Sequence, residues 1–255
     1  MKLDLTGKTA FITGASQGIG AASARALASR GAKVVLAARN SKALHILAEE
    51  IGPQALPLTC DVSNYANVKH AMEKAVEQFG GLDILVNNAG IIEPIAKIEA
   101  SDPDKWGRVV DVNLKGAYYC MHAAYPFMKE KGGLIVNISS GAATSALEGW
   151  SHYCATKAAL LSLTRCAHKE WGGQGIRVVG LSPGTVATNM QTVIKQSGIN
   201  PVSALDWSAH IPAEWVGKAI VWLTSDAARQ YDGGDFSLKT DEGRRAVGLI
   251  GDPSS

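Results

Sequence analysis

The chain has 255 residues, of which 46% are hydrophobic and 19% are charged, a composition that excludes a disordered segment and allows a sizeable core. The formal net charge of +2 leaves no broad basic surface, so we expect no nucleic-acid partner. No apolar run reaches the roughly 18 residues that span a bilayer, and the N-terminal segment lacks the apolar core of a signal peptide. We therefore expect a cytoplasmic protein without a membrane segment.

The cysteines and histidines show no pattern of a disulfide framework or a metal site. The four cysteines form no C-x-x-C pair, and a chain of this length needs no disulfides for stability. We expect buried or half-buried thiols at Cys60, Cys120, Cys154 and Cys166. The six histidines form neither H-E-x-x-H nor a His/Cys cluster, so no metal is expected.

Short apolar runs alternate along the chain with longer segments of helical spacing. The predicted strands are Thr9–Thr13, Lys33–Ala37, Ala55–Thr59, Ile84–Asn87, Leu134–Ser139, Arg177–Leu181 and, more weakly, Asp235–Leu238. The predicted helices are Gly18–Arg30, Ser41–Ile51, Tyr65–Phe79, Asp102–Met128, Cys154–Trp171 and Ala213–Ser225. This alternation predicts one α/β domain over residues 1–255, with a doubly wound, mostly or wholly parallel sheet of seven strands flanked by helices. Such sheets bind ligands beyond the carboxyl ends of their strands.

A glycine-rich turn follows the first predicted strand and leads directly into a helix. The N-terminal amides and the dipole of that helix can hold a pyrophosphate, which makes this turn the expected dinucleotide site. The predicted binding residues are Gly14, Ser16, Gln17, Gly18, Ile19 and Gly20. An ordinary turn between strand and helix is the alternative.

The ends of the second and third predicted strands carry a basic and an acidic residue. Arg39 lies where a carboxylate would hold the ribose hydroxyls of NAD, and its guanidinium suits the 2′-phosphate of NADP better. NADP(H) is therefore the expected cofactor, with NAD(H) as the alternative and a solvated surface arginine as the other interpretation of Arg39. Asp61, followed by Val62, could accept a hydrogen bond from an adenine amino group, or could be a cap or turn residue.

The fourth predicted strand ends in Asn87, Asn88, Ala89 and Gly90. Small residues let the backbone pass close to a flat ligand, while the side-chain amides can tie strand ends together. The last three of these residues are predicted to contact the cofactor, and an ordinary turn is the alternative interpretation.

Three residues near the fifth strand suggest acid–base chemistry. Ser140 lies at the end of the strand, and Tyr153 follows thirteen positions later. Lys157 is four residues beyond Tyr153, so on a helix the two side chains share one face. A neighbouring ammonium favours phenolate, so Lys157 is expected to lower the pKa of Tyr153 from about 10 towards neutrality.

With these motifs in view, the sequence resembles the short-chain dehydrogenase/reductase family from about Leu5 to about Gly234. The matching elements, in the family's order and spacing, are Thr13–Gly20, Asp61-Val62, Asn87–Gly90, Asn113, Ser140, Tyr153 with Lys157, and Pro183-Gly184 with Thr188. The resemblance implies an NAD(P)-dependent oxidoreductase on a Rossmann-type sheet. It also implies a catalytic tetrad of Asn113, Ser140, Tyr153 and Lys157.

The resemblance implies a role for each residue of the tetrad. In reduction, Tyr153 donates a proton to the carbonyl oxygen that Ser140 hydrogen-bonds, while the cofactor delivers a hydride to the carbon. Lys157 holds the nicotinamide ribose, and Asn113 positions a water. Asn113 could instead be a buried amide that satisfies a local carbonyl, and Ser139 is interpreted as support for the strand end.

The resemblance also implies a nicotinamide clamp formed by Pro183, Gly184, Val186 and Thr188. Two features depart from the family pattern. Gln17 stands where many NADP-preferring members carry a basic residue, and the chain lacks the Val-Asp-Gly-Gly ending after Gly234.

The substrate is expected to be a small or medium carbonyl compound with apolar flanks. A lid is expected at about 189–212, with an apolar lining from Met190, Val193, Ile194, Ile199 and Trp207, and Trp150 is a further wall of the pocket. Alternatively, these lid residues only pack the lid down. The 3-oxoacyl-acyl-carrier-protein reductases are the leading named activity, although the lid segment has no obvious basic cluster to dock an acidic carrier. A sugar, polyol or other secondary-alcohol dehydrogenase is the alternative, and a non-catalytic NADP sensor the remote one.

The helix predicted at Cys154–Trp171 is apolar around much of its circumference, which suggests burial on a second side. By resemblance that side is a subunit interface, and we expect a homotetramer.

Overall fold

The computed structural model describes residues 3–251. Its centre is a seven-stranded, wholly parallel sheet with the strand order β3-β2-β1-β4-β5-β6-β7. The strands are β1 (Thr9–Thr13), β2 (Lys33–Ala38), β3 (Ala55–Thr59), β4 (Ile84–Asn87), β5 (Gly133–Ile138), β6 (Ile176–Ser182) and β7 (Asp235–Ser237). The predicted doubly wound sheet is confirmed, and each strand ends within one residue of its predicted end.

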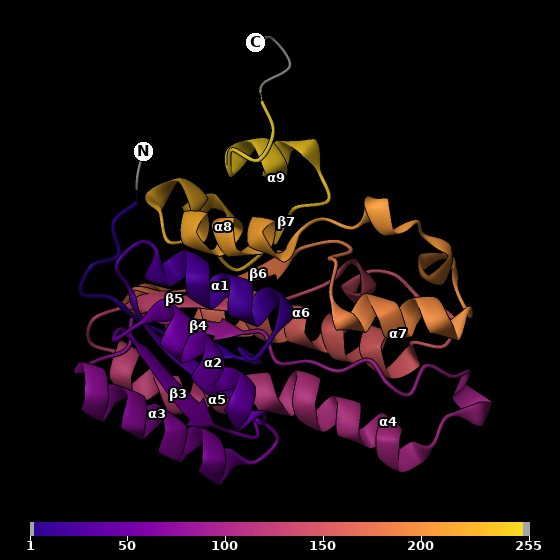
Figure 1. Cartoon of the computed structure of the whole chain (residues 1–255), viewed down its shortest axis with the longest axis horizontal. Helices are drawn as coiled ribbons and strands as arrows, with labels where there is room; N and C mark the ends of the chain where they lie inside the picture. The colour runs from indigo at the N-terminus through magenta and orange to yellow at the C-terminus, as the bar shows by residue number, and fades with distance from the viewer. Residues whose placement is uncertain (1–2, 252–255) are drawn as a thin grey trace.

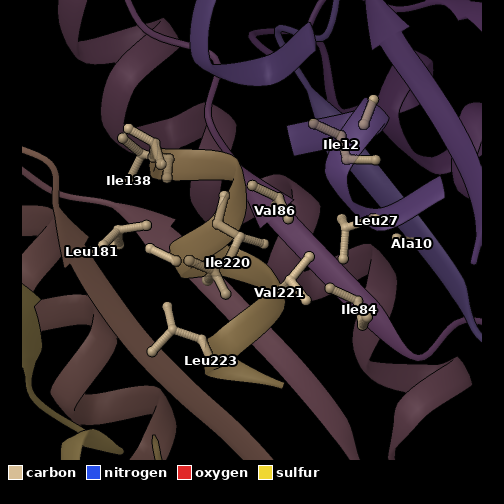
Figure 2. Close-up of a cluster of buried hydrophobic side chains, with 14 of the residues drawn as sticks. Ala10, Ile12, Leu27, Ile84, Val86, Ile138, Leu181, Ile220, Val221 and Leu223 are labelled. Atoms are coloured by element: carbon tan, nitrogen blue, oxygen red, sulfur yellow. The ribbon is translucent and has the colours of Figure 1, made fainter. Parts of the chain in front are cut away.

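Helices cover both faces of the sheet, which explains why its inner strands are continuous apolar runs. One face carries α1 (Gly18–Ala28), α2 (Ser41–Ile51) and α8 (Ala213–Leu223), and the other carries α3 (Tyr65–Phe79), α5 (Gly116–Met128) and α6 (Ser151–Trp171) (Figure 1). Figure 2 shows the first of these interfaces, where Leu27 of α1 and Ile220 of α8 meet Ile12 and Val86 of the sheet. Both layers are therefore buried around one sheet, and the loops at its carboxyl edge are left to bind a ligand.

The prediction of one continuous helix over Asp102–Met128 is wrong, because the structure interrupts it in the middle. Asp102 caps α4 (Pro103–Val110) by accepting hydrogen bonds from two backbone N–H groups of the first turn. A π-helical turn, Asp111–Lys115, then separates α4 from α5. One wide turn barely disturbs the apolar spacing on either side, so the sequence pattern resembles a single helix.

Two helices were not predicted from the sequence. α7 (Asn189–Ser197) lies within the region expected to form a lid, and α9 (Asp241–Ala246) follows β7 near the C-terminus (Figure 1). The α9 segment has no apolar periodicity, and its cap, the Thr240 hydroxyl bound to the Gly243 N–H at 3.1 Å, is a local contact.

The four cysteines are free thiols, but one of them does not have the predicted burial. Cys60 and Cys120 are buried and Cys154 is half-buried, whereas Cys166 is exposed on the outer face of α6. The prediction for Cys166 is wrong because this face of the helix is covered by no other element of the described chain. No helix within residues 3–251 is long and apolar enough to cross a membrane.

Candidate active site

A cavity of about 1010 Å³ opens at the carboxyl edge of the sheet. The segments that follow β1 to β7 all contribute to its lining, as expected for a ligand site of a parallel sheet. Every predicted cofactor residue except Gly20 lines this cavity, and so do three of the four predicted catalytic residues. The fourth, Asn113, is buried behind the lining. No group of three His, Cys, Asp or Glu residues within 3–251 could hold a metal ion.

The glycine-rich turn fits a pyrophosphate. Gly14 and Gly18 have φ values of +63° and +54°, which residues with a Cβ rarely adopt. A Cβ on Gly20 would overlap the Gly14 carbonyl oxygen, so this residue allows α1 to start close to β1. Gln17 makes no side-chain hydrogen bond to the first turn of α1, and that turn has no acidic residue. Its N–H groups are therefore left for an anion.

Asn88 ties β1 to the end of β4, as predicted. Its side-chain amide donates hydrogen bonds to the carbonyl oxygens of Thr13 at 2.9 Å and Gly14 at 3.2 Å. In return the Thr13 hydroxyl accepts from the backbone N–H groups of Asn88 and Ala89, at 2.9 and 3.0 Å. The turn and the segment after β4 thus form one wall of the cavity.

Asp61 is a turn residue that also lines the cavity. One carboxylate oxygen accepts from the backbone N–H and hydroxyl of Ser63, and the other accepts from Arg108 at 2.9 Å. Burial acts to raise the pKa of Asp61, but these hydrogen bonds outweigh it and hold the pKa below its usual value. The cap of α3 is Asn64. Asp61 is therefore a turn residue and does not cap the helix. A hydrogen bond from an adenine amino group to Asp61 stays a prediction.

Tyr153 lies in the first turn of α6, beside the segment that follows β5. Burial raises the pKa of Tyr153 to about 12, although the Ser140 hydroxyl acts in the opposite direction. Lys157 donates a hydrogen bond from Nζ to the Ile138 carbonyl oxygen at 2.7 Å, and burial lowers the pKa of Lys157 to about 8. The prediction that Lys157 brings the pKa of Tyr153 towards neutrality is wrong for this arrangement, because desolvation of the phenol outweighs any attraction between the two groups.

Asn113 lies in the π-helical turn and binds backbone. Its side chain accepts from the Ile91 N–H and donates to the Ile91 carbonyl oxygen, both at 2.8 Å. This is the buried amide of the alternative interpretation. Since Ile91 lines the cavity, Asn113 shapes the site through the segment after β4.

The end of the cavity that Ser140, Tyr153 and Lys157 line is called the catalytic end. The segment after β6 extends from this end to the glycine-rich turn. Pro183, Gly184, Val186 and Thr188 all line the cavity. The Ile211 N–H donates to the Thr185 carbonyl oxygen at 2.9 Å, and the Ala187 N–H donates to the Ile211 carbonyl oxygen at 3.0 Å, so this segment is bound to the residues just before α8. Asn189 reaches the Gln17 side chain at 3.1 Å.

The predicted apolar lining of the lid is partly correct. Met190 and Ile194 line the cavity, but Val193, Ile199 and Trp207 do not, and Trp207 is 46% exposed. The sequence pattern could not show which side of this irregular segment faces inward. Trp150 does line the cavity, with its ring edge-to-face against that of Tyr153 at 5.6 Å.

Three further residues at the catalytic end were missed. Asp235 is largely buried in β7 and accepts a hydrogen bond from the Ser182 hydroxyl at 2.6 Å. Lys239 and Arg244, from the segment after β7, line the cavity. The only signal for them was the unusual sequence that replaces the Val-Asp-Gly-Gly ending.

Known proteins are similar to this chain over most of its length. The family model described as short chain dehydrogenase matches residues 8–198. D-threitol dehydrogenase of Mycolicibacterium smegmatis is 33% identical, covering 92% of each chain, and sorbose reductase of Schizosaccharomyces pombe is 38% identical, covering 91% of this chain and 94% of its own. The crystal structure of 3-ketoacyl-(acyl-carrier-protein) reductase from Brucella melitensis complexed with NADH superposes with a TM-score of 0.82. It is 31% identical and covers 92% of this chain and 98% of its own.

Proposed function

We propose, because the chain belongs to the short-chain dehydrogenase family, that it interconverts a ketone and a secondary alcohol with Tyr153 as the proton donor and acceptor. One observation carries the proposal. Ser140, Tyr153 and Lys157 line the same cavity as the glycine-rich turn at the start of α1, so a dinucleotide held at that turn would reach the phenol. Loss of Tyr153 or Lys157 would mark a non-catalytic sensor, and both are present.

The nicotinamide cofactor supplies or accepts the hydride when it is bound. The start of α1 offers free N–H groups to its pyrophosphate, and the small residues Ala89 and Gly90 leave space for its ribose and rings. Pro183, Gly184, Val186 and Thr188 would hold the nicotinamide end, and Asp61 and Val62 the adenine end.

The side chains of the protein itself carry out the proton transfer. For reduction, Tyr153 donates its proton to the carbonyl oxygen, and the Ser140 hydroxyl hydrogen-bonds that oxygen as negative charge develops on it. Lys157 stabilises the resulting phenolate by its charge and also holds the ribose hydroxyls. For oxidation, the phenolate takes the proton back from the alcohol.

NADP(H) is the preferred cofactor in this proposal. Arg39 is exposed at the rim of the cavity, and it has no ion pair or hydrogen bond to another residue within 3–251. Its guanidinium is therefore available to a 2′-phosphate. NAD(H) use stays open because Gln17 supplies no second positive charge.

The substrate in this proposal is a small secondary alcohol or its ketone. The two enzymes named above that act on threitol and sorbose support this class. Residues 189–212 would act as the lid of a single domain that spans the chain, with Met190 and Ile194 facing the substrate. The similarity to a 3-ketoacyl-(acyl-carrier-protein) reductase supports a second candidate, reduction of a 3-oxoacyl thioester.

The experiment that tests the activity follows cofactor oxidation by absorbance. NADPH and NADH are run side by side against ketoses, cyclic ketones and 3-oxoacyl thioesters. Turnover of one class identifies the substrate family, and no turnover with any member of the panel would contradict the proposed enzyme.

The assembly in this proposal is a homotetramer, with the outer faces of α5 and α6 in an interface. Tyr118 of α5 is 48% exposed, and Ala158 and Cys166 of α6 are exposed on the neighbouring face. Light scattering at micromolar concentration is expected to give four times the chain mass, and a monomer would contradict this assembly.

A further inference from the structure

The charges in the cavity lining are unevenly distributed. Asp61, the single carboxylate in the lining that the described residues form, follows β3 at one edge of the sheet and is paired with Arg108. The catalytic end lies towards the opposite edge, where the lining includes the cations Lys157, Lys239 and Arg244. This end of the cavity therefore carries positive charge with no carboxylate on its surface.

Two of these three cations are already engaged. Lys157 donates to the Ile138 carbonyl oxygen at 2.7 Å. Arg244 donates from Nε to the Leu238 carbonyl oxygen at 2.8 Å, and its guanidinium lies 5.9 Å from the centre of the Trp215 ring. The Lys239 ammonium has no ion pair or hydrogen-bond acceptor among residues 3–251. It is therefore the cation left to bind a ligand.

The backbone that carries Lys239 is fixed. Leu238 is fully buried and donates its N–H to the Ser182 carbonyl oxygen at 2.9 Å, and the Lys239 N–H donates to the Ser237 hydroxyl at 3.2 Å. The hydrogen bond from Arg244 to the Leu238 carbonyl oxygen also stabilises this turn. These contacts fix the position of the Lys239 backbone, from which the lysine side chain extends.

The side chain of Lys239 extends across two glycines of the catalytic end. Its Cγ is 3.1 Å from the position that a Cβ would take on Gly184, and its Nζ is 3.2 Å from the corresponding position on Gly141. Gly141 directly follows Ser140, whose hydroxyl is proposed to bind the reacting oxygen. The ammonium is therefore beside the proposed reaction centre, at the end of β5, whereas the turn proposed to hold the cofactor phosphates follows β1, two strands away in the sheet.

We infer that Lys239 selects substrates that carry a carboxylate near the reacting carbon. The inference rests on the proposed function, since it takes Ser140 and Tyr153 as the site of the reacting oxygen. Lys239 is exposed at the wall of the cavity, where its ammonium attracts an anion, and the lining that residues 3–251 form has no carboxylate here to compete. The glycines at 141 and 184 leave the space that the lysine stem occupies.

The test compares 4-oxocyclohexanecarboxylate with 4-oxocyclohexanecarboxamide, which has nearly the same shape and no charge. Because Lys239 is exposed, we expect kcat/KM of the wild type to favour the acid by about three- to fivefold, the effect of one ion pair between partly solvated groups. Lys239→Met is expected to reduce that preference to less than about twofold, and Lys239→Glu to reverse it. Lys218→Met, which changes an exposed lysine of α8, is the matched control and keeps the preference.

A binding measurement separates this inference from the proposed reaction. Calorimetry with the unreactive pair cyclohexanecarboxylate and cyclohexanecarboxamide, in the presence of NADPH, is expected to show the same acid preference and its loss in Lys239→Met. If this preference is present while neither ketone and no member of the substrate panel is reduced, the proposed reaction fails and the anion site stands. Equal binding of acid and amide by the wild type, or a preference that survives in Lys239→Met, overturns the inference. It is also overturned if Lys239→Met weakens NADPH itself by the same factor, because the lysine would then belong to the cofactor site.

Discussion

The Lys157 ammonium lies 5.5 Å from the centre of the Tyr153 ring, and both side chains are buried. Burial acts on the two groups in opposite directions along the pH scale, raising the pKa of Tyr153 to about 12 and lowering that of Lys157 to about 8. At neutral pH the pair therefore consists of a neutral phenol and a charged ammonium. That is the state from which Tyr153 can donate a proton to a carbonyl oxygen.

The pH dependence of reduction is expected to report Lys157 rather than Tyr153. Below pH 8 the lysine is charged and stabilises the phenolate that forms, whereas above pH 8 it loses its proton and kcat/KM falls. Tyr153 stays protonated over this whole range. The measurement is kcat/KM for ketone reduction between pH 6 and 10.

Asp235→Asn provides the check on this assignment. The Asp235 carboxylate acts to raise the pKa of Lys157, so removing its charge moves the fall of kcat/KM to lower pH. Asp226→Asn, at an exposed acid that is paired with Arg229 and does not line the cavity, serves as the control and leaves the profile in place. An alkaline limb that is absent near pH 8, or unmoved in Asp235→Asn, is the result that contradicts the assignment.

Arg39→Ala is expected to weaken NADPH by about 10- to 100-fold, the value of a charge-assisted hydrogen bond to phosphate, and to change NADH little. Cofactor fluorescence titration gives both dissociation constants. Lys42→Ala, at the nearby start of α2, is the control for general surface charge. Equal losses for the two cofactors would remove the case for a 2′-phosphate at Arg39.

The stability of the sheet edge depends on a buried ion pair. Arg177 of β6 donates from Nε to Asp232 at 2.8 Å and from Nη1 to the Leu223 carbonyl oxygen at 3.0 Å, and the side chains of both Arg177 and Asp232 are only 10% exposed. Asp232→Ala would leave the guanidinium buried without its anion, and we expect the free energy of unfolding to fall by about 3–5 kcal/mol.

Denaturant unfolding measures this loss. Glu77→Ala removes the exposed partner of Lys74 and is the comparison variant, for which no resolvable change is expected. If Asp232→Ala and Glu77→Ala lower the free energy of unfolding by the same amount, the buried ion pair does not stabilise the sheet edge.

The sheet could be predicted from the sequence because its inner strands are buried on both faces and appear as apolar runs bounded by turns. The glycine-rich turn and the pair Tyr153 and Lys157 were found for a similar reason, since their spacing is local. Asn113 was harder, because its π-helical turn and its two bonds to Ile91 depend on a segment 22 residues away. The pKa of Tyr153 also required the fold, since burial by distant elements decides it.

The position of the segment after β7 could not be predicted from the sequence. Its sequence departs from the family ending, and nothing local to Lys239 indicates that it returns across Gly141 and Gly184. A long-range backbone hydrogen bond from Leu238 to Ser182 of β6 brings it there. The residue inferred to select a substrate is therefore less visible in the sequence than the residues proposed to hold a cofactor.

The most direct measurement of the central claim compares wild type and Tyr153→Phe in two assays, NADPH oxidation with the best ketone of the panel and NADPH binding by fluorescence. Removing only the phenolic hydroxyl is expected to lower kcat by at least about 100-fold, the usual contribution of a positioned acid, and to leave the dissociation constant of NADPH unchanged. Turnover by Tyr153→Phe at the wild-type rate would contradict the role of Tyr153 as the proton donor.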